Sequence, residues 1–261
     1  MLFRSHLRTN LQWAERPFGD PERPFSRERS LVAALDVEWT KNFRVRGASK
    51  PFCYSWAIID LAHVDSLEDQ SLLEFGFKSV YLESEDEVPQ LLEMIESDIA
   101  SSQTLSGVTF AGHQLCADLS VLKRSSPIAT EQVDWLYDKW RERRQNQAVI
   151  DTRYDIDRLT PIASRRLVDV AEDLGLDVTQ PELAKGSMTK LHKTYLETHQ
   201  ADIFEKLAVL NLRHSLSTAF IAAIYLGAAV PRPLNVNNLL SDHLVHDFEY
   251  VNSSEFAELV Y

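Results

Sequence analysis

Residues 31–38 constrain the fold of this chain more than any other segment. Their sequence, LVAALDVE, is an apolar run that ends with two carboxylates, Asp36 and Glu38, at alternate positions. Alternate side chains of a β-strand point to the same face, so both carboxylates share one surface. At the end of a hydrophobic strand they repel each other and lose hydration, and a divalent cation offsets both costs. The segment therefore predicts a buried strand with a metal-binding end.

The elements that follow predict an α/β fold with a mixed five-stranded sheet flanked by helices. Apolar runs at 52–61 and 72–82 predict two strands that form an antiparallel meander with 31–38. Short runs at 107–112 and 148–152 predict two more strands, which alternate with helices and are therefore expected to pair in parallel. Helical spacing, or a long apolar run closed by Gly and Pro, predicts helices at 85–100, 113–122, 128–146, 167–174 and 202–226.

One domain is expected between residues 31 and 230 of the 261-residue chain. Residues 1–30 hold three prolines and little periodicity, which predicts an extended N-terminal arm, and residues 231–261 are expected to be a C-terminal tail. The first 30 residues lack the apolar stretch of a secretory signal, and the apolar run 219–230 is shorter than the roughly 20 residues that span a bilayer. Two cysteines give no disulfide framework. We therefore expect a cytoplasmic protein with no membrane partner.

Charge argues against broad binding to duplex nucleic acid, because 27 basic and 39 acidic residues give a net charge of −12. A local basic cluster, Lys41, Arg44 and Arg46, directly follows the acidic strand. Placed at the rim of a site, these side chains would meet phosphates, and Trp39 or Phe43 would stack on bases. The same cluster is also consistent with a solvated hairpin.

A second motif lies where the fourth expected strand meets a helix. Residues 112–119, GHQLCADL, place Asp118 inside the opening turns of that helix. Together with residues 35–40, LDVEWT, this segment resembles the two leading motifs of the DEDD superfamily of 3′-to-5′ exonucleases, which have a ribonuclease H-like fold. Residues 151–152 and 166–176 are similar to later family segments that are structural more often than catalytic. The resemblance spans about residues 31–228.

This resemblance implies a metal-dependent 3′-to-5′ exonuclease acting on the 3′ end of single-stranded DNA or RNA. In that family, carboxylates hold two divalent ions about 3.5–4 Å apart. By resemblance, Asp36, Glu38 and Asp118 would bind one or two Mg²⁺ or Mn²⁺ ions. The adjoining segment would contact the substrate through Thr40, Lys41, Arg44 and Arg46.

The chain departs from the family at the fourth acidic position. Aligning residues 217–221 with the last family helix places His214 where the fourth aspartate belongs, and places Val209 and Leu210 at the positions of the general base. Three carboxylates leave two dications less compensated, and an imidazole nitrogen suits manganese better than magnesium. His214 is therefore a catalytic candidate, either as a ligand in an altered site or as a base that activates water.

Several alternatives remain open at this point. The whole domain is alternatively a catalytically inactive ribonuclease H-like module that binds nucleic acid or protein. Asp118 is alternatively a carboxylate that interacts with a helix dipole, and His214 an interior histidine with hydrogen bonds and no metal. His113 is expected to be a structural hydrogen-bond donor. No glycine-rich phosphate loop is present, so no cofactor besides metal is implied.

Overall fold

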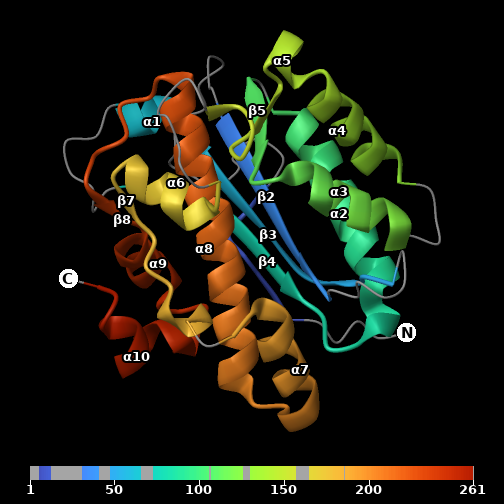
Figure 1. Ribbon diagram of the computed structural model, residues 1–261, viewed down its shortest axis with the longest axis vertical. Helices are drawn as coiled ribbons and strands as arrows, with labels where there is room; N and C mark the ends of the chain where they lie inside the picture. Colours follow the sequence, from blue (N-terminus) through green and yellow to red (C-terminus); the bar gives the residue numbers. More distant parts are fainter. Residues whose placement is uncertain are drawn as a thin grey trace.

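The computed structural model describes residues 6–12, 31–40, 48–65, 73–105, 107–125, 130–156, 165–184 and 186–260. Within these ranges, six strands form one mixed sheet in the order β1-β4-β3-β2-β5-β6. Figure 1 shows the central strands β4, β3, β2 and β5 of this sheet. A second sheet holds two short strands, β7 and β8. The strand bounds are β1 His6–Thr9, β2 Leu31–Trp39, β3 Pro51–Asp60, β4 Gly76–Tyr81, β5 Val108–Gly112, β6 Val149–Asp151, β7 Leu176–Asp177 and β8 Leu234–Asn235.

Strand directions confirm the expected α/β mixed sheet. β2, β3 and β4 form an antiparallel meander, while β5 runs parallel to β2 and β6 runs parallel to β5. The sheet has six strands rather than the expected five, because β1 pairs antiparallel with β4. The predicted N-terminal arm therefore contributes an edge strand. Four half-polar residues are too few to show a strand pattern in the sequence.

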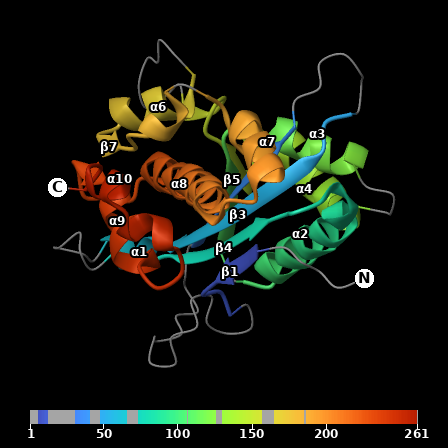
Figure 2. The ribbon, with the colours of Figure 1, turned by 90° about the horizontal axis from the view of Figure 1, so that it is seen from below.

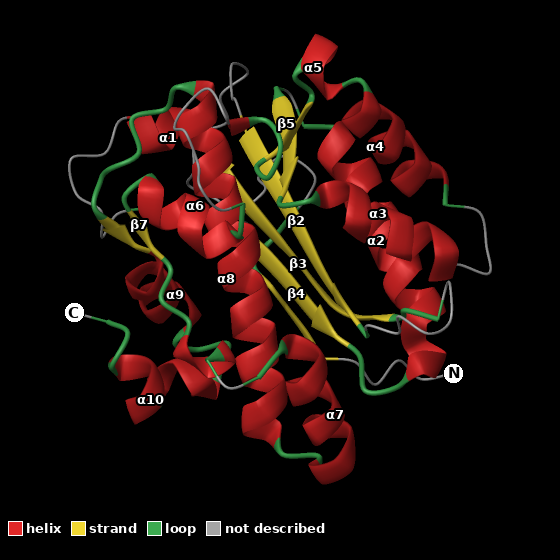
Figure 3. Cartoon of the chain, viewed as in Figure 1, coloured by secondary structure: helices red, strands yellow, loops and turns green. Residues whose placement is uncertain are grey.

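Helices cover both faces of the sheet (Figure 3). In the view from below, α2, α3 and α4 lie on one side of the strands, and α6, α8 and α9 lie on the other (Figure 2). The helices of the described ranges are α1 Leu61–Asp65, α2 Val88–Gln103, α3 Leu115–Ser125, α4 Glu131–Arg141, α5 Arg143–Asn146, α6 Leu167–Asp173, α7 Met188–Thr198, α8 Ala201–Leu226, α9 Val236–Leu244 and α10 Ser254–Ala257, with 3₁₀ helices η2 Glu85–Glu87, η4 Pro181–Leu183 and η5 Glu249–Asn252.

The alternation of side chains along β2 divides the core into two halves. Val32 and Ala34 pack into the hydrophobic cluster that contains α8, whereas Leu31 and Leu35 pack into the cluster formed with α2, α3 and α4. All four side chains are at most 2% exposed. Because strand side chains alternate, Asp36 continues the row that faces α8. The fold thus directs the acidic end of β2 toward that helix.

The 26-residue helix α8 is the central helix of the molecule. It is long and apolar enough to cross a membrane, yet 89% of its most apolar 18-residue window is buried inside the protein. A helix that is hydrophobic on all sides is expected in a core. It ends at Gly227, whose φ of 93° lies in the left-handed region that favours glycine. The predicted helix at 202–226 is confirmed.

The C-terminal segment is part of the folded body rather than the tail expected from sequence. It forms β8, α9, η5 and α10, and Leu240 and Phe256 are fully buried in the same cluster as α8. Arg213 on α8 makes a buried ion pair with Glu182 of η4, with 3.0 Å between Nη2 and Oε1. The Tyr250 hydroxyl donates to the same carboxylate at 2.8 Å. These contacts join η4, α8 and η5.

Candidate metal centre

The two carboxylates of β2 point toward α8 from the end of the strand. Their side chains are 13% exposed for Asp36 and 17% for Glu38. In the sheet Asp36 pairs with Ser55 and Glu38 with Cys53, and the pairing register shifts directly after Glu38. The apolar first part of β2 is buried on both faces. The acidic groups lie at the other end of the strand, where burial is incomplete. The sequence interpretation of residues 31–38 as one strand agrees with this arrangement.

His214 on α8 lies against both carboxylates. Its Nδ1 atom is 3.5 Å from Asp36 Oδ2 and 3.5 Å from Glu38 Oε1. One ligand atom from each of these three residues lies within 4.8 Å of the other two. The other ring nitrogen, Nε2, is 2.8 Å from Oε1 of Gln180. The structure therefore brings together three of the four predicted catalytic residues, and it adds Gln180.

Asn211, one helical turn before His214, is a second site residue that sequence reasoning missed. Its Nδ2 donates to Oδ2 of Asp36 at 2.5 Å, and its Oδ1 lies 3.4 Å from the Cys53 thiol. Asn211 is fully buried. Burial, followed by the charges of Glu38 and Asp36, raises the pKa of the Cys53 thiol, so the thiol is a neutral donor. Asn211 thus holds one oxygen of Asp36 in place.

Asp118 lies in the first turn of α3 and lines the same cleft as the three grouped residues, without belonging to their close group. It is 3% exposed, and its Oδ2 is buried without a hydrogen-bond partner among the described residues. Burial raises the pKa of Asp118 well above its usual range, and the charges of Asp36 and Glu38 raise it further. A buried, unpartnered carboxyl beside two other acids requires either a proton or a cation.

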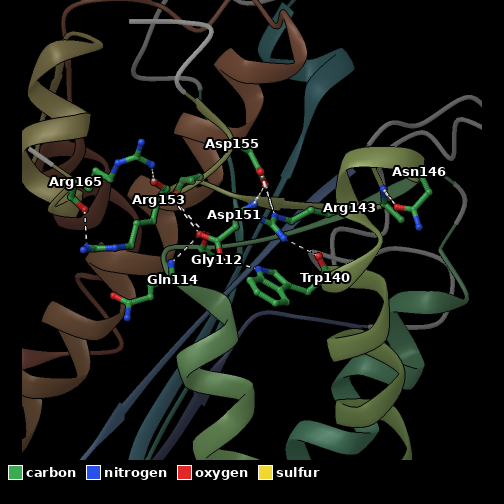
Figure 4. Close-up of polar contacts among 11 residues, drawn as sticks. Gly112, Gln114, Trp140, Arg143, Asn146, Asp151, Arg153, Asp155 and Arg165 are labelled. Atoms are coloured by element: carbon green, nitrogen blue, oxygen red, sulfur yellow. Dashed lines mark hydrogen bonds and ion pairs between the residues drawn. The ribbon is translucent and has the colours of Figure 1, made fainter. Parts of the chain in front are cut away.

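Asp151, at the end of β6, positions the start of α3 (Figure 4) and does not belong to the close group of Asp36, Glu38 and His214. Its Oδ1 accepts the backbone N–H groups of Gln114 at 2.9 Å and Arg153 at 3.1 Å, and its Oδ2 accepts Trp140 Nε1–H at 2.8 Å. Its own N–H donates to Asp155. The bond to Gln114 holds a residue whose φ is 67°. These hydrogen bonds give Asp151 a structural role.

The turn between β5 and α3 depends on close packing. A Cβ atom at Gly112 would lie 2.7 Å from the Leu115 side chain, so only glycine fits there without displacement. His113 donates from Nε2 to the Arg165 carbonyl at 2.9 Å, and its Nδ1 accepts the Thr152 hydroxyl at 3.0 Å. Burial lowers the pKa of His113 to about 4. His113 is therefore a neutral structural donor, as expected.

A cleft of about 560 Å³ surrounds the acidic group. Trp39 lines it, but Thr40 does not, because the Thr40 hydroxyl accepts the Lys50 N–H at 3.1 Å and so closes the β2–β3 connection. The other predicted substrate contacts, Lys41, Arg44 and Arg46, lie outside the described residues. The described lining is Asp36, Val37, Glu38, Trp39, Ser49, His113, Gln114, Asp118, Arg166, Leu167, Val168, Gln180 and His214.

Arg166 is the arginine of the described lining. Its side chain is 75% exposed, and Nε and Nη2 bind the two oxygens of Asp169 at 2.7 and 2.6 Å. An arginine fork that holds a carboxylate has the geometry to hold a phosphate instead. Arg166 lies far along the chain from residues 36–46, so its place in this cleft is not visible in the sequence.

The electrostatics of the acidic group favour a bound cation. Burial lowers the pKa of His214, but hydrogen bonds to Asp36 and Glu38 and their negative charges outweigh burial and raise it to about 9. At neutral pH the ring therefore carries an additional proton next to the carboxylates. A metal ion at this position would replace that proton, because metal binding requires a neutral imidazole.

The donor set fits one divalent ion. Two carboxylate oxygens and one imidazole nitrogen suit Mn²⁺ or another transition ion better than Mg²⁺, which prefers oxygen ligands alone. The buried, unpartnered oxygen of Asp118 in the same cleft is a further potential donor. Asn211 already donates to Asp36 Oδ2, so that oxygen is less available to a second ion.

Comparison with known proteins gives no relative: no family model, curated protein or solved structure matches the chain.

Proposed function

We propose that this protein is a metal-dependent 3′-to-5′ exonuclease that hydrolyses phosphodiester bonds of single-stranded DNA or RNA. The observation that carries the proposal is the close group of Asp36, Glu38 and His214 in a cleft that also contains Asp118. Two carboxylates and an imidazole within 4.8 Å of one another form a site for a divalent ion, and such ions catalyse phosphoryl transfer.

The sheet supports a ribonuclease H-like assignment. That fold combines an antiparallel meander with parallel strands added beside its first strand. Here β2 has the meander on one side and β5 and β6 on the other. The location of Asp36 and Glu38 at the end of β2, and of Asp118 in the first turn of α3, supports the comparison with the DEDD motifs. Fold alone does not establish an activity, so the proposal depends on the site.

The residues of the cleft would have different roles in hydrolysis. Asp36, Glu38 and His214 would hold the ion, with Asp118 as an additional ligand. When bound, such an ion lowers the pKa of coordinated water and polarises a phosphoryl oxygen. Trp39 would stack on a base, and Arg166 would exchange Asp169 for a substrate phosphate. The basic cluster Lys41, Arg44 and Arg46 would extend the same phosphate contacts.

A second function, an inactive module that binds nucleic acid or protein, is favoured by one specific observation. Val209 and Leu210, at the positions of the family base, are fully buried apolar side chains. Among the described residues of the cleft, the histidines are His113, which is engaged in structural bonds, and His214, which lies between carboxylates. Water activation would therefore depend on the ion alone.

Degradation of end-labelled single-stranded oligonucleotides tests the proposal. DNA and RNA carrying a 5′ label are incubated with wild-type protein and Mg²⁺, Mn²⁺ or chelator, and 3′-labelled strands report the direction. We expect stepwise shortening of the 5′-labelled strand, faster with Mn²⁺ and abolished by chelator or by Asp36→Ala. The control Asp138→Asn removes a carboxylate from the exposed side of α4 and should retain activity. Absence of cleavage with either metal would contradict the exonuclease and favour the inactive module.

A further inference from the structure

Gln180 is the polar neighbour of His214 that the function proposed above does not use. It lies at the N-terminal cap of η4 and is partly buried on the wall of the cleft. Its amide oxygen is 2.8 Å from Nε2 of His214. An amide oxygen has no hydrogen to donate, so at this distance the ring nitrogen must be the donor. The contact therefore requires a proton on Nε2.

That proton determines which atom of His214 faces the acidic residues. A neutral imidazole carries one N–H, and if Nε2 holds it, Nδ1 has a lone pair. Nδ1 is the atom that lies 3.5 Å from both Asp36 Oδ2 and Glu38 Oε1. Three lone-pair donors then converge on one point. The opposite tautomer would place an N–H at that point and leave no nitrogen ligand.

The loop that carries Gln180 is anchored independently of its amide. Glu182, two residues further on, makes the buried ion pair with Arg213, which precedes His214 on α8. Both side chains of that pair are at most 2% exposed. Two consecutive residues of α8 thus contact two residues of one loop. The ion pair fixes the loop against the helix, and the Gln180 amide is directed at the imidazole.

We propose that Gln180 is a positioning residue that fixes His214 in the Nε2–H form and so presents Nδ1 as the metal ligand. The inference rests on the metal site of the proposed function. Metal-binding histidines generally donate their second N–H to an acceptor, and loss of that acceptor typically lowers metal affinity about 10- to 100-fold. A glutamine supplies this acceptor without adding a charge to a site that already holds three carboxylates.

Metal affinity of variants tests the proposal directly. Calorimetric titration with Mn²⁺ and with Zn²⁺ compares wild type, Gln180→Leu, Gln180→Glu and the control Thr179→Val, which removes a hydroxyl that donates to Asp177. We expect Gln180→Leu to bind about 10- to 100-fold more weakly, while Gln180→Glu and Thr179→Val retain affinity. In a His214→Asn background, Gln180→Leu should cause no further loss of metal affinity. A purely structural role of Gln180 would cause a further loss in that background. Equal affinity of Gln180→Leu and wild type would overturn the proposal.

Nitrogen-15 NMR of histidine-labelled, metal-free protein at pH 10, where the ring is neutral, tests the same point without any metal. We expect His214 Nε2 to carry a proton in wild type and that proton to exchange faster with solvent in Gln180→Leu. A wild-type ring with a bare Nε2 and a proton on Nδ1 would overturn the role of Gln180. If wild type bound neither metal, the exonuclease proposal would fail, whereas the tautomer would still decide whether Gln180 orients the ring.

Discussion

At the level of single residues, some polar groups of the site have hydrogen-bond partners, and one buried oxygen has none within the described part of the chain. Asp36 has Asn211 as a donor at 2.5 Å, and His214 contacts Gln180. Asp118 has a buried oxygen with no partner among the described residues. Such groups reduce stability, and they are retained where a ligand completes them. A substitution that removes such an unpartnered group is therefore expected to stabilise the metal-free protein and to weaken its metal binding.

Asp118→Asn should stabilise the metal-free protein and weaken its metal binding. Burial and the charges of Asp36 and Glu38 raise the pKa of Asp118 in the folded state. At pH 7 this carboxyl is ionised in the unfolded chain, so its raised pKa in the folded state lowers the free energy of unfolding. An amide of the same shape removes that cost. Thermal unfolding with chelator should show a higher Tm, by roughly 2–4 °C for each kcal/mol gained. A lower Tm in chelator would show that the carboxyl is structurally required.

Stability of the metal-free protein should fall at alkaline pH because of His214. Its folded pKa of about 9 exceeds the ordinary 6.5, so its contribution is complete below pH 6.5 and is lost as pH rises through 9. A shift of this size corresponds to roughly 3 kcal/mol. Urea unfolding with chelator at pH 7 and pH 9.5 measures the loss, and His214→Asn supplies the reference. Equal pH dependence in the two proteins would contradict the assignment.

At the scale of elements, the site forms where α8, β2, α3 and the loop before η4 meet. The buried pair of Arg213 and Glu182 connects the loop to the helix, with Tyr250 as a third partner. Breaking one side of a buried ion pair leaves an uncompensated charge, which generally costs more than the pair contributes. This contact therefore links the stability of the fold to the position of Gln180.

Glu182→Gln should destabilise the protein by about 3–5 kcal/mol, because Arg213 would remain buried without its counter-ion. The matched control is Arg141→Met, which removes an ion pair with Asp138 in which the two side chains are 67% and 69% exposed. An exposed pair contributes at most about 1 kcal/mol. Urea unfolding of both variants gives the comparison. Similar losses in the two variants would show that the buried pair has no special role.

Sequence patterns identified most of these elements, for physical reasons visible in particular residues. Residues 31–35 form the continuous apolar run of a strand that is buried on both faces, and α8 shows its length and apolar character directly. Asn211 and Gln180 could not be selected, because a single amide has no periodicity and its partners are distant in sequence. The break of the expected helix at 128–146 near Glu142, and helix α7, also required tertiary contacts.

At the scale of the whole molecule, the chain forms one body in which both of its outer segments take part. β1 completes the edge of the sheet, and residues 234–260 close the face that carries α8. Residues 1–30 are expected to form an arm because they hold three prolines and little periodicity, and residues 231–261 are expected to be a tail, since neither segment shows a pattern that predicts these elements. Apolar side chains of the C-terminal segment, such as Leu234 and Phe256, are buried in the cluster that contains α8.

Removal of residues 231–261 should abolish cooperative folding. The truncation would expose the α8 face now covered by α9 and α10 and would delete the Tyr250 bond to Glu182. Removing one buried leucine or phenylalanine contact typically costs about 2–5 kcal/mol, and this deletion removes several. Near-ultraviolet circular dichroism and urea unfolding measure the result. A truncated protein with a sharp transition and native signal would show that the segment is a tail after all.

We propose that Asp36, Glu38 and His214 hold one divalent ion, and electron spin-echo spectroscopy of bound Mn²⁺ is the measurement that tests these ligands. We predict about one tightly bound Mn²⁺ per chain, with nitrogen modulation from a directly coordinated imidazole in wild type. That modulation should disappear in His214→Asn, while Asp36→Ala should lose the bound ion. Mn²⁺ that binds without nitrogen coupling, or that binds equally well to Asp36→Ala, would contradict the claim.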